Sequence, residues 1–213
     1  MARTAAPDVV GGRRVILLGL TGYRQSGKST VGRFLQSYGF TPYAFADALR
    51  AMAYAINPII SLRGAPPASL ADMDTDVEWR YAELVDLLGY ETAKAIPDMR
   101  RFLQHLGTDG LRATFGPNVW VRLLAERLDV TAPARAVITD VRFASEAAWI
   151  SERGGTLWRV ERPGVGGRDP HVSEKELVSL PVARTITAPS TAVLEVEVRT
   201  AVAAAAWDTV SLV

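Results

Sequence analysis

The sequence contains no cysteine and only two histidines, His105 and His171, among its 213 residues. A chain without thiols forms neither a disulfide framework nor a thiolate metal site, and two histidines alone indicate no histidine metal site. The lack of cysteine also fits a protein that works in the cytoplasm.

Long hydrophobic runs are absent as well. No stretch approaches the roughly 20 apolar residues that a membrane span requires, and residues 1–12 lack the apolar segment of a secretory signal. We therefore expect a cytoplasmic protein without a membrane partner.

Neither sign of charge is in excess, since 24 basic residues face 23 acidic ones. A face that binds a nucleic-acid backbone broadly needs a basic excess, so we expect no stable nucleic-acid partner. The balance still allows a local basic pocket.

The chain does carry a phosphate-binding loop pattern. The octet Gly22-Tyr23-Arg24-Gln25-Ser26-Gly27-Lys28-Ser29 fits GxxxxGK[ST]. It follows an apolar run at 15–20 and precedes a segment with helical character, 28–37, that Gly39 would stop. Strand, loop and helix therefore occur in the order that this motif requires.

Each residue type in the loop has a physical reason. Gly22 and Gly27 let the backbone approach a phosphate, so that N–H groups and the helix N-terminus converge on one anion. Lys28 would reach the β- and γ-phosphates, and the Ser29 hydroxyl would join a Mg²⁺ shell. The residues that we expect to bind the nucleotide are Gly22, Arg24, Gln25, Ser26, Gly27, Lys28, Ser29 and Thr30.

Strand-like apolar segments occur at 15–20, 43–45, 136–139, 156–161 and 184–187, and helical patterns alternate with them at both ends of the chain. Such alternation is typical of a mostly parallel sheet with helices on both faces. The sequence therefore predicts a three-layer α/β/α fold with a mostly parallel five-stranded sheet.

The middle of the chain predicts four successive helices without a strand. Apolar spacing favours helices at 47–56, around Trp79 to Leu88, from about Pro97 with a break at Gly107 to Gly110, and from Gly116 onward.

These helices suggest a helical insertion, at about 57–130, beside the sheet. We expect one domain over 14–213, closed by a helix at 190–207 and preceded by a flexible leader, 1–13. The apolar end of the closing helix would pack either inward or against a second copy, as in a homodimer.

Polar residues follow the predicted strands, where parallel sheets bind their ligands. Asp47 lies with Arg50, and Asp140 lies with Arg142 and Glu146. Asp140 would hold Mg²⁺ or contact the acceptor, with a helix cap as the alternative. Arg142 would grip a phosphate, whereas the helix dipole alone can explain Glu146.

A second loop, 162–171, contains three glycines and two prolines and is typical of a mobile lid. Arg162 and Arg168 could close over the phosphates, with a plain surface role equally open for Arg168. Arg100 or Arg101 would reach the crevice. Trp120 has helical spacing that favours the core over a base-stacking role.

The motifs together resemble the phage-type deoxynucleoside monophosphate kinases. The similarity runs from about Val15 to Glu174 and is carried by order and spacing. Besides the phosphate loop it includes Gln104-His105-Leu106-Gly107-Thr108-Asp109-Gly110, Asn118-Val119-Trp120-Val121, Asp140-Val141-Arg142-Phe143 with Ser145-Glu146-Ala147, Arg162-Pro163-Gly164, and His171-Val172-Ser173-Glu174. Two residues depart from the family pattern. Ser29 stands where some relatives carry an acidic residue, and Ser145 stands where many carry an asparagine.

This resemblance implies a P-loop kinase that transfers the γ-phosphoryl of ATP to a deoxynucleoside monophosphate with Mg²⁺, in a host cytoplasm if phage-encoded. It places Asp140, Arg142 and Glu146 around the acceptor with Trp120 nearby, the segment after Asp47 on the acceptor side, and 162–172 in the lid. The candidate catalytic residues are Lys28, Asp140, Arg142 and Arg162, and the candidate metal ligands are Ser29 and Asp140. The candidate substrate-binding residues are Asp47, Arg101, Gln104, Trp120, Asp140, Arg142 and Glu146.

Two alternatives stay open. One is another small-molecule P-loop kinase, for example of a coenzyme precursor. The other is a nucleic-acid-dependent ATPase or nucleotide switch, which the missing Asn-Lys-x-Asp pattern and the balanced charge disfavour.

Overall fold

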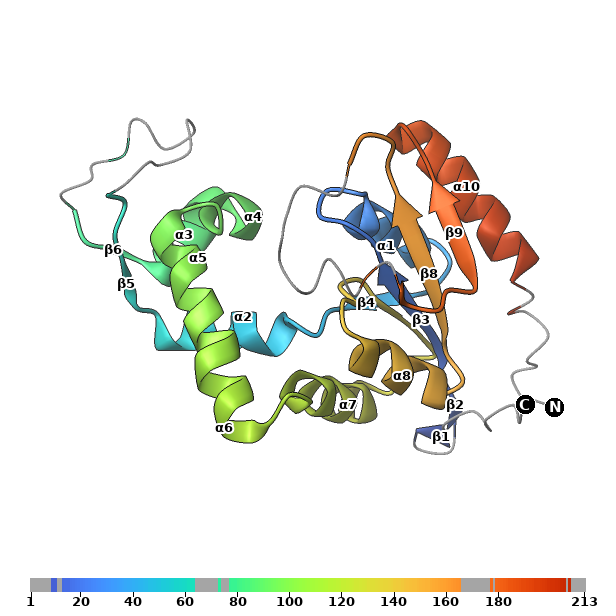
Figure 1. Ribbon diagram of the computed structural model, residues 1–213, viewed down its shortest axis with the longest axis horizontal. Coiled ribbons are helices and arrows are strands. Elements are labelled where there is room, and N and C mark those ends of the chain that lie inside the picture. Colours follow the sequence, from blue (N-terminus) through green and yellow to red (C-terminus); the bar gives the residue numbers. More distant parts are fainter. Residues whose placement is uncertain are drawn as a thin grey trace. The chain divides into compact units, whose positions relative to one another are not determined.

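The computed structural model describes residues 9–10, 13–63, 73, 77–165, 177, 179–205 and 207. The chain divides into two compact units, one made of Met1–Phe45 with Leu123–Val213 and the other of Ala46–Arg122. The first unit carries a five-stranded sheet, and the second is mostly helical (Figure 1).

The sheet of the first unit is wholly parallel. Its strands lie in the order β4 (Thr41–Tyr43), β7 (Arg135–Ile138), β3 (Ile16–Thr21), β8 (Thr156–Glu161) and β9 (Arg184–Thr187). All neighbouring strands run in the same direction. The predicted α/β fold with five strands is confirmed, and the strand that begins the phosphate loop is the central one.

One strand lies earlier than predicted. We expected 43–45, but β4 ends at Tyr43. Tyr43 O accepts the last ladder bond from Thr139 N at 2.9 Å, whereas the next two residues leave the ladder. The Phe45 N–H instead donates to the Asp140 side chain. A side chain therefore replaces the strand partner at this point.

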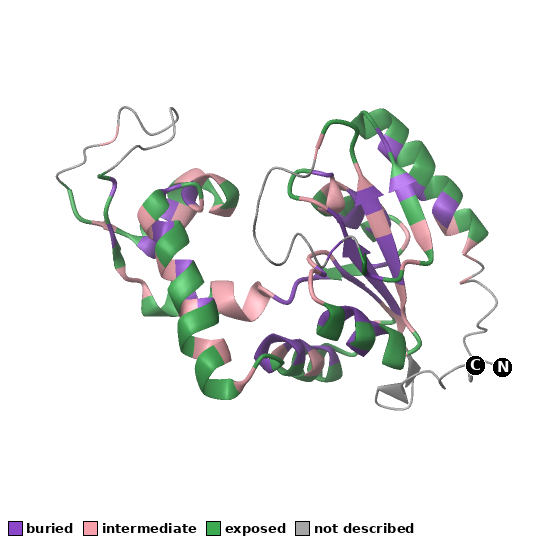
Figure 2. Ribbon diagram, in the orientation of Figure 1, coloured by how far each residue is buried: buried purple, intermediate pink, exposed green. Residues whose placement is uncertain are grey.

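Helices cover both faces of the sheet. On one face, α1 (Lys28–Gln36) and α10 (Thr191–Ala204) pack against Leu18, Leu20 and Val160. On the other face, α8 (Ala144–Glu152) brings Ile150 against Gly19, whose missing side chain leaves room for it. Figure 2 shows the strands between these layers as largely buried. The three-layer prediction is thus confirmed.

The closing helix packs inward in the described part of the chain. Ser190 caps it by accepting a hydrogen bond from Val193 N at 3.4 Å. Beyond the helix, the Trp207 ring stacks on Trp158 at 5.3 Å and meets the edge of Phe40 at 5.0 Å. Aromatic pairs of this kind fix the end of the chain against the core.

The second unit contains several short helices and a small β-pair. In chain order these are α2 (Asp47–Ile56), β5 (Ile59–Ile60), β6 (Trp79–Arg80), α3 (Tyr81–Leu88), α4 (Tyr90–Ala93), α5 (Pro97–Gln104), the π-helix η2 (His105–Arg112), α6 (Ala113–Phe115) and the beginning of α7 (Val119–Thr131). Their core includes Tyr81, Leu84, Ile96 and Met99.

Two predictions for this unit were wrong. Trp79 is not helical, because it pairs with Ile60 in an antiparallel two-stranded sheet, so the helices do not follow each other without a strand. The expected break at Gly107 to Gly110 is absent, because the chain continues from α5 as a π-helix. Glycine at this position allows close packing instead, because a Cβ at Gly107 would lie 3.2 Å from Leu49 Cδ2.

Near the N-terminus, β1 (Val9–Val10) pairs with β2 (Arg13–Arg14) within the stretch expected to be a flexible leader. Arg168 and His171 of the predicted lid lie outside the described residues.

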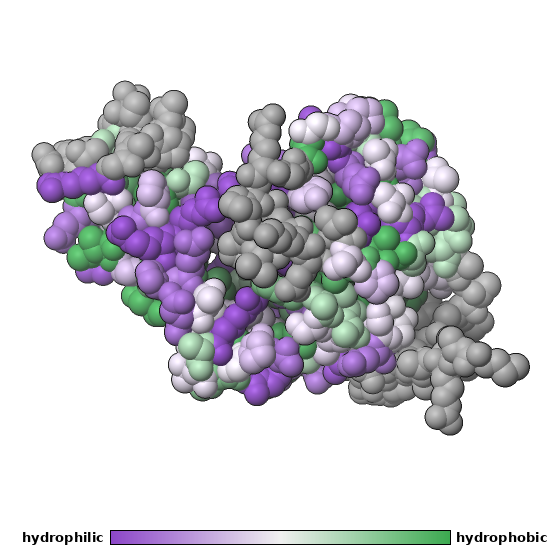
Figure 3. Space-filling model, viewed as in Figure 1, coloured by the Kyte–Doolittle hydropathy of each residue, from purple (hydrophilic) through white to green (hydrophobic). Residues whose placement is uncertain are grey.

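Within the described part of the chain, no helix combines the length and hydrophobicity that a membrane crossing demands. On the face drawn in Figure 3, the apolar residues form scattered small groups rather than one continuous surface.

Candidate active site

The phosphate loop connects the central strand β3 to α1, as the motif predicts. Gly22 and Gly27 have φ angles of 139° and 104°, which disfavour any other residue. A Cβ at Gly22 would lie 2.2 Å from Val160 O. Gln25 also has a positive φ, 65°. The loop is therefore tightly wound, and Gly22 lies directly against the backbone of β8.

Lys28 folds back over the loop. Its Nζ donates hydrogen bonds to Gly22 O at 2.7 Å and to Tyr23 O at 2.6 Å. These bonds hold a positive charge above the loop backbone, where the motif places the β- and γ-phosphates. Ser29 and Arg24 are exposed, whereas Thr30 is half-buried.

The loop has the donor chemistry that a polyphosphate needs. No described side chain caps the N-terminus of α1, and its first turn carries no acidic residue. The Ser26 and Thr21 hydroxyls are buried and have no hydrogen-bond partner among the described residues. Buried hydroxyls without partners are uncommon, and a bound anion would satisfy donors of this kind. These residues therefore fit a nucleoside triphosphate.

A dedicated protein metal cage is not present in the described residues, since no group of three or more His, Cys, Asp or Glu side chains comes together. Mg²⁺ in phosphoryl-transfer sites usually takes only one or two protein ligands besides phosphate oxygens and water. Ser29 and Asp140 fit that smaller requirement by type.

Asp140 and Arg142 lie at the same edge of the sheet as the phosphate loop. β7 runs parallel to β3 with Ile138 opposite Gly19, and Val141 N donates to Leu20 O at 3.1 Å. The segment after β7 therefore runs beside the last residues of β3. The arrangement that would have excluded the predicted site, with these two residues at the opposite edge, does not occur.

Glu146 is buried, with 5% of its surface exposed. Its Oε2 accepts hydrogen bonds from Arg142 N at 2.7 Å and from Phe143 N at 3.1 Å. These contacts close the first turn of α8 and orient the backbone of Arg142. The capping role that the helix dipole suggested is thus present, and it joins Glu146 to the candidate phosphate-binding arginine.

Arg162 is exposed and follows β8 directly. β8 lies on the other side of β3, with Arg159 opposite Thr21, so Arg162 extends from the same edge as the phosphate loop. The beginning of the predicted lid is a turn in which Val165 N donates to Arg162 O at 3.0 Å. Further along the chain, Arg159 Nη2 donates to Leu177 O at 3.0 Å and to Leu180 O at 3.1 Å.

Four predicted substrate-binding residues belong to the unit Ala46–Arg122. Asp47 begins α2 and pairs with Arg50 at 3.4 Å, and Arg101 pairs with Asp98 while remaining exposed. Gln104 is exposed at the end of α5. Trp120 is 5% exposed and packs near Gly107, as the core interpretation predicted. Their role toward a substrate stays a prediction.

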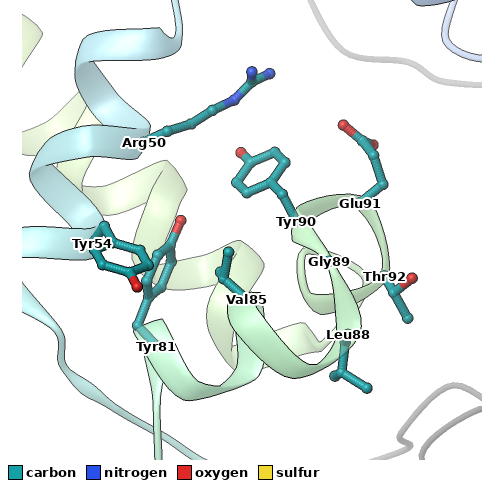
Figure 4. Close-up of a pocket in the computed structure, with 9 residues that line it drawn as sticks. All are labelled: Arg50, Tyr54, Tyr81, Val85, Leu88, Gly89, Tyr90, Glu91 and Thr92. Carbon is teal, nitrogen blue, oxygen red and sulfur yellow. The ribbon is translucent and has the colours of Figure 1, made fainter.

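A cavity of about 600 Å³ lies within this second unit. Arg50, Tyr54, Tyr81 and Tyr90 line it together with apolar residues of α3 (Figure 4). Arg50 was predicted to lie with Asp47, but no motif indicated a role for the tyrosines, which belong to three different helices.

A parallel sheet with a phosphate loop after its central strand defines a P-loop nucleotide-binding protein. The family model described as deoxynucleotide monophosphate kinase matches residues 91–188. A protein of Acanthamoeba polyphaga mimivirus, named "Putative deoxynucleotide monophosphate kinase", is 32% identical over 185 residues, covering 78% of this chain and 84% of the relative. The chain therefore belongs to the deoxynucleotide monophosphate kinase family and is a nucleotide kinase.

The solved structures that match this chain have lower sequence identity than the mimivirus protein. A crystal structure of TT1252 from Thermus thermophilus has a TM-score of 0.47 at 18% identity and covers 89% of this chain and 96% of that one. Dephospho-CoA kinase from Campylobacter jejuni has a TM-score of 0.40 at 14% identity, and the match covers 89% of this chain and 97% of that chain.

Proposed function

We propose that the chain transfers the γ-phosphoryl group of ATP to a deoxynucleoside 5′-monophosphate, with Mg²⁺, to give the diphosphate and ADP. One observation supports it above the others: the backbone bond from Val141 N to Leu20 O places the Asp140–Arg142 segment beside the strand that enters the phosphate loop. The triphosphate loop and the candidate acceptor-binding residues of this unit therefore share an edge. Family membership supports the deoxynucleotide acceptor.

The residues divide the work of phosphoryl transfer, which consists mainly of positioning and charge stabilisation. The loop amides and Lys28 would bind the triphosphate, and Ser29 and Asp140 would hold Mg²⁺, which supplies charge neutralisation when bound. Arg142 would grip a phosphate, with its backbone oriented by Glu146. Arg162 would approach the moving phosphoryl group as the lid closes and excludes water.

The proposal also covers the location, the partners and the oligomeric state of the enzyme. By its likeness to phage-type enzymes we place it in the cytoplasm, of a host cell if phage-encoded, with a deoxynucleotide as its partner and no stable nucleic-acid or membrane partner. A homodimer is part of the same expectation, and sedimentation of the purified chain tests it.

Turnover with a panel of acceptors tests the function. We expect ADP formation with one or more of the four deoxynucleoside monophosphates, and turnover with their ribose counterparts measures the discrimination between the two sugars. Turnover only with a dephosphorylated coenzyme precursor would overturn the acceptor class. ATP hydrolysis that depends on added DNA, without consumption of any monophosphate, would overturn the kinase assignment altogether.

A further inference from the structure

The cavity of the unit Ala46–Arg122 lies between α2, α3 and α4. Figure 4 shows Arg50 from α2 and Tyr90 from α4 on one side of it, and Tyr81 from α3 beneath them. Val85 and Leu88 give it an apolar wall. At about 600 Å³ it is within the range of small-molecule sites and large enough for a nucleotide.

Tyr81 is the unusual member of this lining. It is only 1% exposed, and its hydroxyl has no hydrogen-bond partner among the described residues. A buried polar group without a partner costs about 1–3 kcal/mol. Tyr54, by contrast, donates its hydroxyl proton to Asp86 Oδ2 at 2.8 Å. Only one of these two cavity tyrosines is therefore left with an unused hydrogen-bonding group.

The surroundings of Tyr81 determine which kind of ligand group its hydroxyl can bind. Burial and the neighbouring Tyr90 raise the pKa of Tyr81 to about 12, against a smaller lowering by Arg50. The phenol therefore remains protonated at physiological pH and can donate a hydrogen bond. Figure 4 shows its hydroxyl directed toward the side of the cavity where Arg50 and Tyr90 lie.

Arg50 adds positive charge on that side. Its guanidinium lies 4.6 Å from the centre of the Tyr90 ring, and its side chain is 37% exposed. Asp47 pairs with Arg50 at 3.4 Å and moderates this charge, and Glu91 also lines the cavity, from the exposed side of α4. A donor beside a guanidinium favours an anionic oxygen, such as that of a phosphomonoester.

We propose that Tyr81 is a specificity-determining residue of the acceptor site, where its hydroxyl donates a hydrogen bond to the phosphomonoester of the deoxynucleotide beside Arg50. This inference rests on the proposed function. The hydroxyl is fully buried in the structure, so the proposal requires the ligand to displace the stacked side chains of Arg50 and Tyr90. Selection for the charged monophosphate over the uncharged nucleoside follows directly.

Calorimetric binding to the full chain tests the proposal. The ligands are each deoxynucleoside monophosphate, the matching deoxynucleoside and inorganic phosphate, and the variants are Tyr81→Phe and Tyr54→Phe. A hydrogen bond to a charged group contributes roughly 1.5–3 kcal/mol, so Tyr81→Phe should weaken monophosphate binding about tenfold or more and leave nucleoside binding unchanged. Tyr54→Phe, the control from the same cavity, should leave both affinities within about twofold.

Folding is controlled in the same series. Removing an unpaired buried hydroxyl should leave the urea midpoint of Tyr81→Phe equal to or above that of wild type, so weaker binding would not reflect a damaged fold. Unchanged monophosphate binding would overturn the proposal. Equal weakening of nucleotide and nucleoside binding would also overturn it, because the contact would then be with the base or sugar. Weaker binding of inorganic phosphate alone would overturn it as well. If wild type binds ATP but no deoxynucleotide, the proposed function and this inference fall together, whereas the other outcomes leave the function standing.

Discussion

Asp140 Oδ1 accepts a hydrogen bond of 2.8 Å from the backbone N–H of Phe45. Asp140 follows β7, and Phe45 follows the neighbouring strand β4, so the bond joins two strand ends. Phe45 is also the last residue of its unit before the chain enters Ala46–Arg122. Asp140 therefore has a structural contact in addition to its proposed role toward metal or acceptor.

Replacing Asp140 separates these two roles. Asp140→Asn retains an oxygen that can accept the Phe45 bond, so its unfolding free energy should stay close to wild type. Asp140→Ala leaves a buried N–H without that acceptor and should lose about 1–3 kcal/mol in urea unfolding. Turnover should fall about 100-fold or more in both variants if the carboxylate acts on metal or acceptor. Normal turnover in Asp140→Asn would limit the residue to its structural contact.

Glu146 should behave as a positioning residue for Arg142. Its carboxylate belongs to a buried residue and makes two charge-assisted, partly buried contacts with backbone N–H groups, so Glu146→Ala should reduce the free energy of unfolding by about 1–3 kcal/mol and raise the acceptor's KM. Glu146→Gln keeps an accepting oxygen and should recover most of both properties. A raised KM in Glu146→Gln with unchanged stability would instead indicate direct substrate contact.

Gly22 offers a test of the loop geometry. In Gly22→Ala the new methyl group would meet Val160 O, so the loop must shift, and we expect at least about tenfold weaker ATP binding. Gly116→Ala is a matched control, because Gly116 has φ 88° but no atom of the described residues lies within 4 Å of the added Cβ. The control should show only backbone strain of about 1–2 kcal/mol, with ATP affinity retained. Equal ATP affinity in both variants would contradict the close approach.

The sheet and the phosphate loop could be predicted because their signals are local. Leu17, Leu18 and Leu20 form an apolar run of the kind that a strand covered on both faces requires, and GxxxxGK[ST] follows it at once. Asp140 could be predicted for the same reason, since a polar residue after a buried strand marks the ligand-binding edge.

The structure of the second unit could not be predicted in full, because it depends on contacts between residues that are distant in the sequence. Trp79 has helical spacing to Leu84 and Leu88, but its backbone pairs with Ile60, which no local pattern indicates. Gly107 looked like a helix break and is a packing site against Leu49. The Tyr81 cavity arises from three helices together, so no single stretch of sequence carries a signal for it.

Lys28 should matter far more for transfer than for folding. Its two hydrogen bonds to loop carbonyls are only partly buried, so Lys28→Met should cost about 1 kcal/mol or less in urea unfolding. The charge that stabilises the transferring phosphoryl group would be lost, and turnover should fall about 100-fold or more. A Lys28→Met enzyme with normal turnover would show that the loop does not act on the phosphates as proposed.

Tyr81 also makes a prediction for alkaline pH. The pKa of Tyr81 is raised from 10.0 to about 12 in the folded chain. Between these values the unfolded chain has released the phenol proton while the folded chain still holds it, so the free energy of unfolding must fall as pH rises, by up to about 1.4 kcal/mol per pH unit. Below pH 10 both states are protonated, and Tyr81 adds no slope.

Urea unfolding of wild type and Tyr81→Phe across this range isolates the contribution, because all other groups titrate alike in both. The two stability curves should run parallel below about pH 10 and separate above it, with wild type losing more. Tyr54→Phe serves as the comparison, since the pKa of the exposed Tyr54 is raised mainly by its hydrogen bond to Asp86. Curves for wild type and Tyr81→Phe that stay parallel up to pH 12 would mean that the Tyr81 hydroxyl is hydrated, and an unpaired donor would no longer be there to bind a phosphomonoester.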